Sequence, residues 1–223
     1  PNDGSGPVKT RAGQILMAIG RRPDVSRLLG KDISLDMKDG KIAVDSDFET
    51  SEPGVYAIGD VAARTQLAHV AAAQGTYVVE KIAGRPHSIK LEVVPNGMFV
   101  SLPIVPNCIY TDPEIATVGI TEEIAKKYGL KVRCGHFSMR DNGKSIITGE
   151  EHGFIRLLFE AYSNTIVGAQ MMCPRATDMI GEIATAIANG LTAQEMSFAM
   201  RAQPTYNEGI GAAIEDAMRQ NPV

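Results

Sequence analysis

A short apolar run, residues 55–58, is enclosed by the turn pair Pro53 and Gly54 on one side and by Gly59 and Asp60 on the other. An apolar run of this length between turn residues is typical of a buried strand, and open α/β folds bind ligands where such strands end. Gly59 would let the backbone approach a ligand closely, and Asp60 can accept hydrogen bonds from sugar-like hydroxyls. The same residues also fit a strand that simply runs into a solvated turn.

Two further apolar segments accompany this run. Downstream, residues 66–75 (QLAHVAAAQG) are small and apolar enough to begin a helix that lies against a flat cofactor, with free backbone N–H groups at its start. This helix is expected over 67–82 and is expected to end at Ala83 and Gly84. Upstream, residues 15–23 (ILMAIGRRP) indicate another apolar strand that ends in Gly20 and two arginines.

In this order and at this spacing, the three segments resemble the pyridine nucleotide-disulfide oxidoreductases, and most closely the dihydrolipoamide dehydrogenases among them. That family has a strand ending in A-I-G-R-R-P, then T-x-x-x-x-V-Y-A-I-G-D, then L-A-H, which stand here at 18–23, 50–60 and 67–69. The resemblance implies that Gly59 and Asp60 contact FAD, with Asp60 on the ribityl chain. It further implies that Gly20 lies near the nicotinamide nucleotide, NAD(P), and that the backbone of four residues approaches the flavin ring: Gln66, Leu67, Ala68 and His69.

The composition is that of a globular protein, with 44% hydrophobic and 22% charged residues and a net charge of −4. A chain with this charge is not expected to bind nucleic acid. No apolar run approaches the roughly 20 residues that span a bilayer, and the first residues lack the features of a signal peptide. We therefore expect a cytoplasmic protein without membrane association.

The three cysteines, Cys108, Cys134 and Cys173, are far apart and form no C-x-x-C pair. Local spacing therefore supports neither a zinc site nor a redox disulfide, and buried free thiols are expected. The histidines outside the 67–69 motif are also scattered singly, so no metal site is expected.

Members of the family need about twice this length to hold an FAD domain, an NAD domain and an interface domain. The sequence has no G-x-G-x-x-G at the start of a βαβ unit for either pyrophosphate. We interpret the chain as a carboxyl-terminal part of such a protein. Residues 1–22 would be the last strand of the NAD-binding domain, 23–101 the carboxyl-terminal part of the FAD-binding α/β domain, and 102–223 the interface (dimerisation) domain.

The last part of the chain alternates hairpins with amphipathic helices, which predicts an α+β fold: an antiparallel sheet with covering helices. Strands are expected at 108–110, 116–119, 154–161 and 165–172, and an apolar helix is expected from about 179 to Asn189 and Gly190. Earlier in the chain, Asp39 and Gly40 predict a tight hairpin between strands at 33–35 and 41–44.

The run Gln203-Pro204-Thr205-x-x-Glu208 resembles the family signature H-P-T-x-x-E, in which the histidine and glutamate act as a charge-coupled base toward the partner subunit's disulfide. Here Gln203 stands at the histidine position, and a carboxamide can exchange hydrogen bonds but cannot take up a proton. Glu208 keeps its place, although Thr205 and Glu208 are also spaced as a capping box for the last helix. The resemblance also implies a cis bond between Gln203 and Pro204.

The resemblance implies an FAD-dependent, NAD(P)-linked homodimer that oxidises a dihydrolipoyl or other dithiol substrate. It also implies that this chain alone, as a part of that enzyme, would be inactive and would mainly form the dimer. Gln203 leaves open a transhydrogenase-like or diaphorase flavoprotein without dithiol chemistry. A stand-alone dimerisation module is the third alternative. A C-x-x-x-x-C pair upstream would favour the dithiol reaction.

Overall fold

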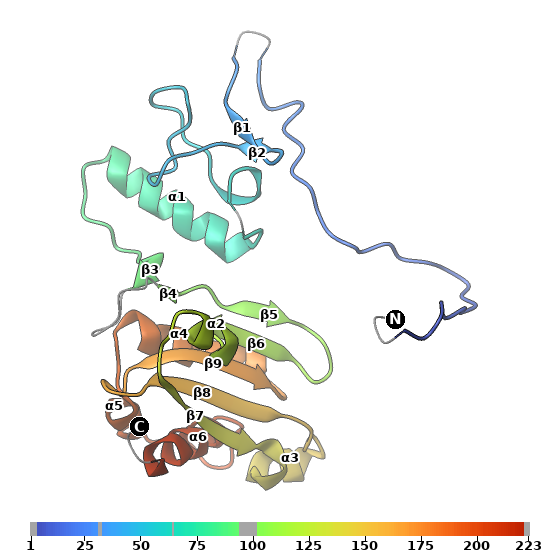
Figure 1. Cartoon of the computed structure of the whole chain (residues 1–223), viewed down its shortest axis with the longest axis vertical. Coiled ribbons are helices and arrows are strands. Elements are labelled where there is room, and N and C mark those ends of the chain that lie inside the picture. The colour runs from blue at the N-terminus through green and yellow to red at the C-terminus, as the bar shows by residue number, and fades with distance from the viewer. Residues whose placement is uncertain (1–3, 31–32, 64, 94–101, 221–223) are drawn as a thin grey trace. The chain divides into compact units, whose positions relative to one another are not determined.

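The computed structural model of the chain describes residues 4–30, 33–63, 65–93 and 102–220. The chain, drawn in Figure 1, divides into two compact units, Pro1–Val78 and Val79–Val223. Each unit has its own core. The boundary expected between residues 101 and 102 adjoins residues 94–101, which lie outside the described residues. The three-part division of the chain therefore stays a prediction.

The hairpin in the first unit is formed by β1 (Met37–Lys38) and β2 (Lys41–Ile42), which pair antiparallel with Lys38 opposite Lys41. Asp39 and Gly40 both have positive φ, 52° and 75°, as the mirror-image turn of a two-residue hairpin requires. The predicted hairpin is confirmed. Its first strand is not 33–35, however, because a two-residue turn places residues 37–38 opposite 41–42.

Helix α1 (Ala68–Ile82) agrees with the predicted helix at 67–82 and buries Val70, Gln74 and Val78, a stripe with a spacing of four residues. It ends as predicted at Gly84, whose φ is 62°, while the Arg85 amide bonds back to the carbonyl of Glu80. The small core of this unit lies around Leu35, Ile42 and Ala57.

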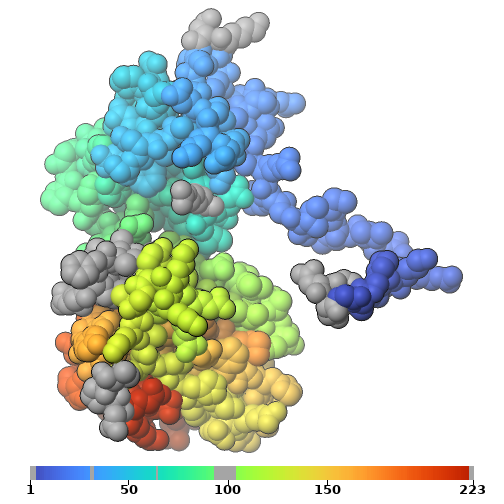
Figure 2. Space-filling view, viewed as in Figure 1, coloured from blue at the N-terminus to red at the C-terminus, as the bar shows by residue number. Residues whose placement is uncertain are grey.

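Two expected strands of the first unit are not formed. Residues 55–58 contribute only an isolated bridge between Tyr56 and Glu49, followed by the short 3₁₀ turn η1 (Gly59–Val61). Residues 15–19 belong to no strand, and their apolar side chains are exposed; Figure 2 draws this part in blue, in a narrow strip of atoms. A strand needs a neighbour for its N–H and C=O groups, and none of the described residues provides one for 15–19. Residues 55–58 do bond to 48–50, through the Ala57 amide to Phe48 and the Thr50 amide to Val55, but the pairing is too short to form a strand.

The second unit contains a five-stranded antiparallel sheet with the order β5-β6-β9-β8-β7. Its strands are β5 (Asn107–Ile109), β6 (Ile115–Gly119), β7 (Val132–Ser138), β8 (Phe154–Glu160) and β9 (Ile166–Met172). A separate two-stranded pair joins β3 (Glu92–Val93) to β4 (Leu102–Pro103). The four strands expected in this part are thus present.

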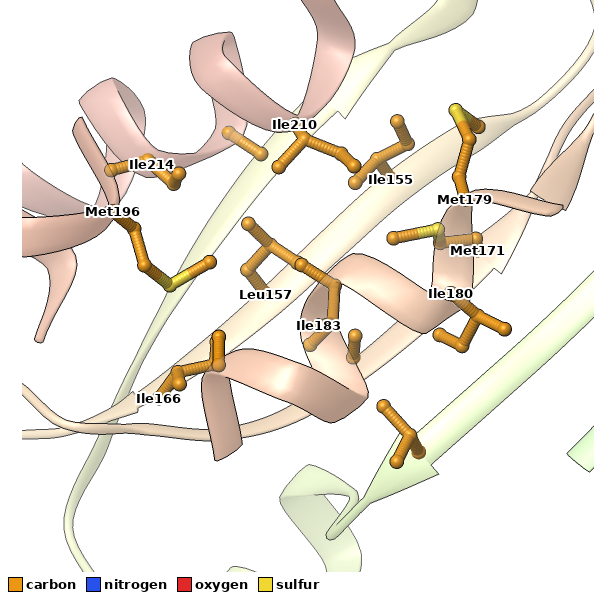
Figure 3. Packing of buried hydrophobic residues seen from close by; sticks show 14 of the residues in the cluster. Ile155, Leu157, Ile166, Met171, Met179, Ile180, Ile183, Met196, Ile210 and Ile214 are labelled. Carbon is orange, nitrogen blue, oxygen red and sulfur yellow. The ribbon is translucent and has the colours of Figure 1, made fainter. Parts of the chain in front are cut away.

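Helices cover the sheet, and the predicted α+β architecture is confirmed. Helix α4 (Ala176–Ala188) packs on β6 and β9, and α6 (Glu208–Arg219) packs on β7 and β8. The main core lies beneath these helices, where Ile155 and Leu157 of β8 meet Ile183 and Ile210 (Figure 3). Alternation along β8 turns Leu158 to the opposite face.

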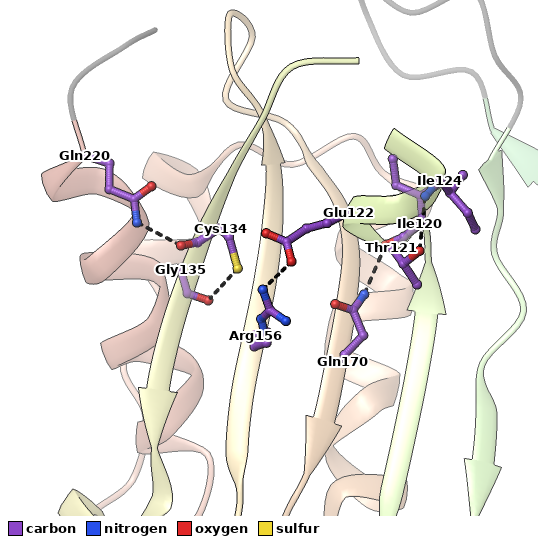
Figure 4. Close-up of polar contacts among 9 residues, drawn as sticks. All are labelled: Ile120, Thr121, Glu122, Ile124, Cys134, Gly135, Arg156, Gln170 and Gln220. Carbon is purple, nitrogen blue, oxygen red and sulfur yellow. Dashed lines mark hydrogen bonds and ion pairs between the residues drawn. The ribbon is translucent and has the colours of Figure 1, made fainter. Parts of the chain in front are cut away.

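Three short helices complete this unit. They are α2 (Glu122–Lys127), α3 (Gly143–Thr148) and α5 (Ala193–Ser197), and the 3₁₀ turn η2 (Met139–Asp141) precedes α3. Helix α2 begins at Thr121, whose hydroxyl accepts from the Ile124 amide, and Glu122 pairs with Arg156 of β8 (Figure 4). Helix α2 thus closes the smaller core on the other face of the sheet, around Ile120, Ala125, Leu158 and Val167.

The edge strand β7 is covered by α6. The Asp216 carboxylate accepts from the His136 amide (2.9 Å), and the Gln220 amide donates to the Cys134 carbonyl (2.8 Å; Figure 4). Gly135 allows the close approach, because a Cβ there would lie 1.9 Å from the carbonyl oxygen of Ala213. This edge is therefore occupied by side chains from the carboxyl-terminal end of α6 and from Gln220, which follows it.

Candidate functional site

The loop at Gly59 is held against α1 by close contact and by a buried hydrogen bond. Gly59 has φ +67°, and a Cβ at this position would lie 2.9 Å from the Cβ of Ala71. Its amide donates to Gln74 Oε1 at 2.8 Å. Both the backbone conformation and the space therefore require glycine.

Asp60, the next residue, keeps its carboxylate at the surface. Its side chain is 35% exposed and lies 3.6 Å from a guanidinium nitrogen of Arg21, which is 80% exposed. An ion pair this exposed contributes about 0–1 kcal/mol, so a ligand hydroxyl can replace it at little cost. The pair also brings Gly20, the residue before Arg21, toward this surface; Gly20 is exposed and has φ 135°.

The start of α1 adjoins the Gly59 loop. Gln66 and Leu67 are half-buried, whereas Ala68 and His69 are exposed. The first N–H groups of an α-helix have no acceptor within the helix, so this end favours an electron-rich group. We call Gly59, Asp60 and residues 66–69 the loop–helix surface; it suits a ligand that has both hydroxyl groups and a flat face.

Gln203 and Glu208 lie in the second unit and line one hollow of about 620 Å³, together with Asp141, Arg201 and Glu215. We call this the Gln203 hollow. Gln203 is exposed and Glu208 is half-buried. The bond between Gln203 and Pro204 is cis, as predicted.

The capping box expected from Thr205 and Glu208 forms only in half. The Glu208 carboxylate accepts from the Thr205 amide (2.9 Å), but the Thr205 hydroxyl donates to the carbonyl of Ala202 (2.6 Å). Helix α6 begins at Glu208 itself, with Asn207 before it, so Glu208 is not at the third helical position that a box requires. Thr205 instead closes the loop that carries Gln203.

Two polar residues of other elements, Glu182 and Asn142, hold this loop, and the sequence analysis did not single them out. Glu182 of α4 accepts from Arg201 (2.6 Å) and from Asn207 (3.2 Å). Asn142, which caps α3, donates to the carbonyl of Thr205 (3.0 Å). The loop is therefore attached at residues on both sides of Gln203.

Tyr206 lies beside a second hollow of about 630 Å³ on the same loop. Its hydroxyl bonds to Glu150 and to Thr148, the latter at 2.9 Å. Burial, and then the bond to Glu150, raises the pKa of Tyr206, whereas the same bond lowers the pKa of Glu150. At neutral pH this pair is a phenol that donates to a carboxylate.

The cysteines are free thiols, but only Cys173 is buried; Cys108 and Cys134 are half-buried, which corrects the expectation. Burial raises the pKa of Cys173 to about 12, so it is a packing residue. Among the residues that the structure describes, no group of three or more His, Cys, Asp or Glu is placed to hold a metal ion. No helix in the described ranges has both the length and the apolar character for crossing a membrane.

Comparison with known proteins identifies relatives of nearly the whole chain. It is 34% identical to a dihydrolipoyl dehydrogenase of Geobacillus stearothermophilus over 97% of this chain and 44% of that protein. A dihydrolipoyl dehydrogenase of Bacillus subtilis is 35% identical over 91% of this chain and 40% of its own length. The chain thus spans less than half the length of these relatives.

Solved structures share the fold. LpdA from Mycobacterium tuberculosis matches with a TM-score of 0.78 and 27% identity, over 92% of this chain and 42% of that one. The flavoprotein disulfide reductase RclA from Escherichia coli matches with a TM-score of 0.74 over 89% of this chain and 43% of that one; at 18% identity it supports the fold alone.

Two family models cover most of the sequence. One, described as pyridine nucleotide-disulphide oxidoreductase, matches residues 3–75. The other, the dimerisation domain of the same family, matches residues 105–214. The chain therefore belongs to the pyridine nucleotide-disulphide oxidoreductase family.

Proposed function

We propose that this chain supplies the carboxyl-terminal part of an FAD-dependent, NAD(P)-linked disulfide oxidoreductase similar to dihydrolipoyl dehydrogenase. The observation that carries the proposal is the loop–helix surface. A glycine that accepts no side chain is followed by a weakly paired carboxylate, beside the open end of α1. The relatives that match nearly the whole chain, named dihydrolipoyl dehydrogenases, support the same reaction class.

The proposed cofactor roles follow the chemistry of this surface. Asp60 accepts hydrogen bonds from the ribityl hydroxyls of FAD, and Gly59 lets the backbone come close. The backbone of residues 66–69 faces the flavin ring, and Gly20 lies near the nicotinamide nucleotide. When bound, FAD supplies the redox chemistry between nicotinamide and substrate. The chain alone is proposed to bind FAD weakly, because it carries no G-x-G-x-x-G for the pyrophosphate.

At the proposed substrate site, Gln203 and Glu208 stand at the positions where the family has the histidine and the glutamate of its charge-coupled base. The carboxamide of Gln203 can hold a substrate atom by hydrogen bonds but cannot accept a proton from a thiol. A positioned acid–base group typically contributes 10²–10⁴-fold in rate, which is about 3–5 kcal/mol of barrier. We therefore propose slow oxidation of dihydrolipoyl or other dithiol substrates, with transfer from NAD(P)H to artificial acceptors left intact.

Gln203 also favours a second candidate. A flavoprotein that passes electrons from NAD(P)H to an acceptor without a dithiol step, as a transhydrogenase or a diaphorase does, needs no base at this position. The exposed, non-titrating side chain of Gln203 fits such a reaction directly. Activity with artificial acceptors alone, in a protein without an upstream cysteine pair, would favour this candidate.

We further propose that the protein is a homodimer, with an interface above about 1,000 Å² as stable dimers have. The family model over 105–214 is a dimerisation domain. Phe198 and Met200 are 72% and 100% exposed, and Met196 lines a hollow of about 360 Å³ between α4 and α5. Apolar side chains this exposed beside a hollow suit contact with a second subunit. The cytoplasmic location stays a prediction.

The test uses the full-length protein that contains this chain. Asp60→Ala should abolish stoichiometric flavin absorbance. Asp24→Ala should retain it, because Asp24 is a carboxylate of the same unit that accepts hydrogen bonds from its near neighbour Ser26. Gln203→His should raise dithiol turnover without changing NAD(P)H-dependent reduction of artificial acceptors. Full flavin content in Asp60→Ala would overturn the cofactor assignment. If the wild-type protein already oxidises dithiols at rates typical of the family, and Gln203→His does not change the rate, then the assignment of the base position is wrong.

A further inference from the structure

Glu182 joins the two ends of the loop that carries Gln203. One carboxylate oxygen accepts from Arg201 Nη2 at 2.6 Å, and the other accepts from Asn207 Nδ2 at 3.2 Å. Arg201 and Asn207 bracket residues 202–206. A single side chain of α4 therefore sets the distance between the points where this loop begins and ends.

In the ion pair between Glu182 and Arg201 the guanidinium is largely removed from water, whereas the Glu182 side chain is 34% exposed. The Arg201 side chain is only 10% exposed, its Nη1 donates to the carbonyl of Ala199 at 3.2 Å, and its Nε is buried without a hydrogen-bond partner among the described residues. Desolvation makes such a pair a poor source of stability, and apolar residues often replace it without loss. The structural consequence of this ion pair is therefore geometric, because it holds Arg201 at one end of the loop.

Asn142 holds the same loop from another element. Its side-chain oxygen accepts from the Ser145 amide (2.9 Å) and so caps α3, while its amide group donates to the carbonyl of Thr205 (3.0 Å). Asn142 is 2% exposed. The loop is thus fixed to α3 at Thr205 and to α4 at both of its ends, while Gln203 remains exposed.

We propose that Glu182 and Asn142 are positioning residues: they hold residues 202–206 in one geometry and thereby fix where the Gln203 side chain lies relative to the Glu208 carboxylate. The inference rests on the proposed function only in naming Gln203 and Glu208 as the groups that face substrate. The geometry of the loop is measurable without any enzymatic activity.

The first experiment measures amide hydrogen exchange in this chain. Glu182→Asp keeps the charge but is one methylene too short to reach both Arg201 and Asn207. Exchange of the Thr205 amide should accelerate about tenfold or more, the size expected when a charge-assisted hydrogen bond is lost. Glu122→Asp shortens the ion pair with Arg156 on the other face of the sheet and is the matched control, for which no change at Thr205 is expected.

A second variant separates the two bonds of Asn142. In Asn142→Asp the carboxylate still accepts from Ser145, so α3 stays capped, but the donor to the Thr205 carbonyl is gone. The Thr205 amide should again exchange faster, while the buried Leu157 amide in the sheet should not change. Equal acceleration at Thr205 and Leu157 would mean general destabilisation, and no acceleration would mean that the loop needs no tether; either result overturns the proposal.

A third measurement reports position directly. In Gln203→His the introduced imidazole faces the charged groups of the Gln203 hollow, which are Asp141, Glu208, Glu215 and Arg201. Glu215 is offset by its ion pair with Arg219 and Arg201 by its ion pair with Glu182, so the negative charges of Asp141 and Glu208 should raise the pKa of the imidazole above its ordinary value of about 6.5. Adding Glu182→Asp should return this pKa toward about 6.5, although the net charge is unchanged. Adding Glu122→Asp should leave it raised.

An imidazole pKa that Glu182→Asp does not alter would refute the positioning role. This outcome is independent of the proposed function, which fails separately if Gln203→His leaves dithiol turnover unaffected in the full-length protein. A role in stability alone would change the unfolding midpoint without moving the imidazole pKa.

Discussion

Replacing Gly59 by alanine should destabilise residues 1–78 by about 2–5 kcal/mol, through two separable effects. The φ of +67° places an L side chain in the left-handed region, at a cost of about 1–2 kcal/mol. The added Cβ would also lie 2.9 Å from the Cβ of Ala71, and such overpacking costs about 1–3 kcal/mol. The loop would then move away from α1, and the bond to Gln74 would weaken.

Gly54→Ala provides the control for the first effect. Gly54 has a similar φ, +78°, but a Cβ there meets nothing within 4 Å. Its replacement should cost only the backbone strain of about 1–2 kcal/mol. The difference between the two variants therefore measures the contact between residue 59 and α1.

A double-mutant cycle completes the test. Ala71→Gly removes the opposing Cβ at a helix cost of about 0.5–1 kcal/mol, and in that background Gly59→Ala should cost no more than Gly54→Ala. Amide hydrogen exchange at Gln74 and Val78, buried positions in the interior of α1, gives the opening free energy of this unit. Equal costs for Gly59→Ala and Gly54→Ala, or no coupling with Ala71→Gly, would refute the packing argument for the loop–helix surface.

Three further outcomes are expected. Gly135→Ala should cost about 1–3 kcal/mol in urea unfolding, because its Cβ would clash with α6; an unchanged midpoint would contradict this. Burial opposes ionisation of Glu160, but hydrogen bonds from the Ser163 and Tyr162 amides outweigh burial and lower its pKa. The wild-type protein should therefore have a larger free energy of unfolding than Glu160→Gln above about pH 4.5, and the difference should vanish as the pH falls through the lowered pKa. A difference in unfolding free energy that does not depend on pH would contradict this prediction. Phe198→Asp should yield monomers by sedimentation, whereas Tyr162→Asp, equally exposed, should not; a dimeric Phe198→Asp would reject this interface.

The sequence predicted the second unit better than the first. Strands such as β8 and β9 are long, apolar and joined by a short turn, so local pattern and final pairing agree. In the first unit, residues 15–19 and 55–58 have equally apolar patterns but form no strand. Periodicity reports what a segment can bury and does not report whether a neighbouring strand is available. Residues 15–19 have no pairing segment among the described residues, and residues 55–58 pair with 48–50 over too short a stretch to form a strand.

The motif Thr-x-x-Glu has different outcomes at two places in residues 192–208. At Thr192 and Glu195 the reciprocal capping box forms and begins α5. At Thr205 and Glu208 only the carboxylate bond is made, because the Thr205 hydroxyl turns back to Ala202. At both places the glutamate carboxylate accepts from the amide of the threonine, as the motif predicts. The path of the preceding chain decides whether the second bond forms.

Two polar residues that position the candidate sites differ in how far the sequence reveals them. Gln74 stands four residues from both Val70 and Val78, on the buried stripe of α1, so the spacing alone predicts a buried amide that needs a partner. The partner is the Gly59 amide, which lies only 15 residues away in a segment already suspected from its Gly-Asp pair.

Glu182 gives no such signal, because it lies beside the apolar stripe of α4 and would pass for a solvated charge. Its importance comes from Arg201 and Asn207, which reach it only after the chain has passed through α5. A polar residue within an apolar stripe can therefore be identified as structural before any coordinates are known. A polar residue beside the stripe acquires its role from the tertiary fold, and the groups that fix the geometry around Gln203 are of this second kind.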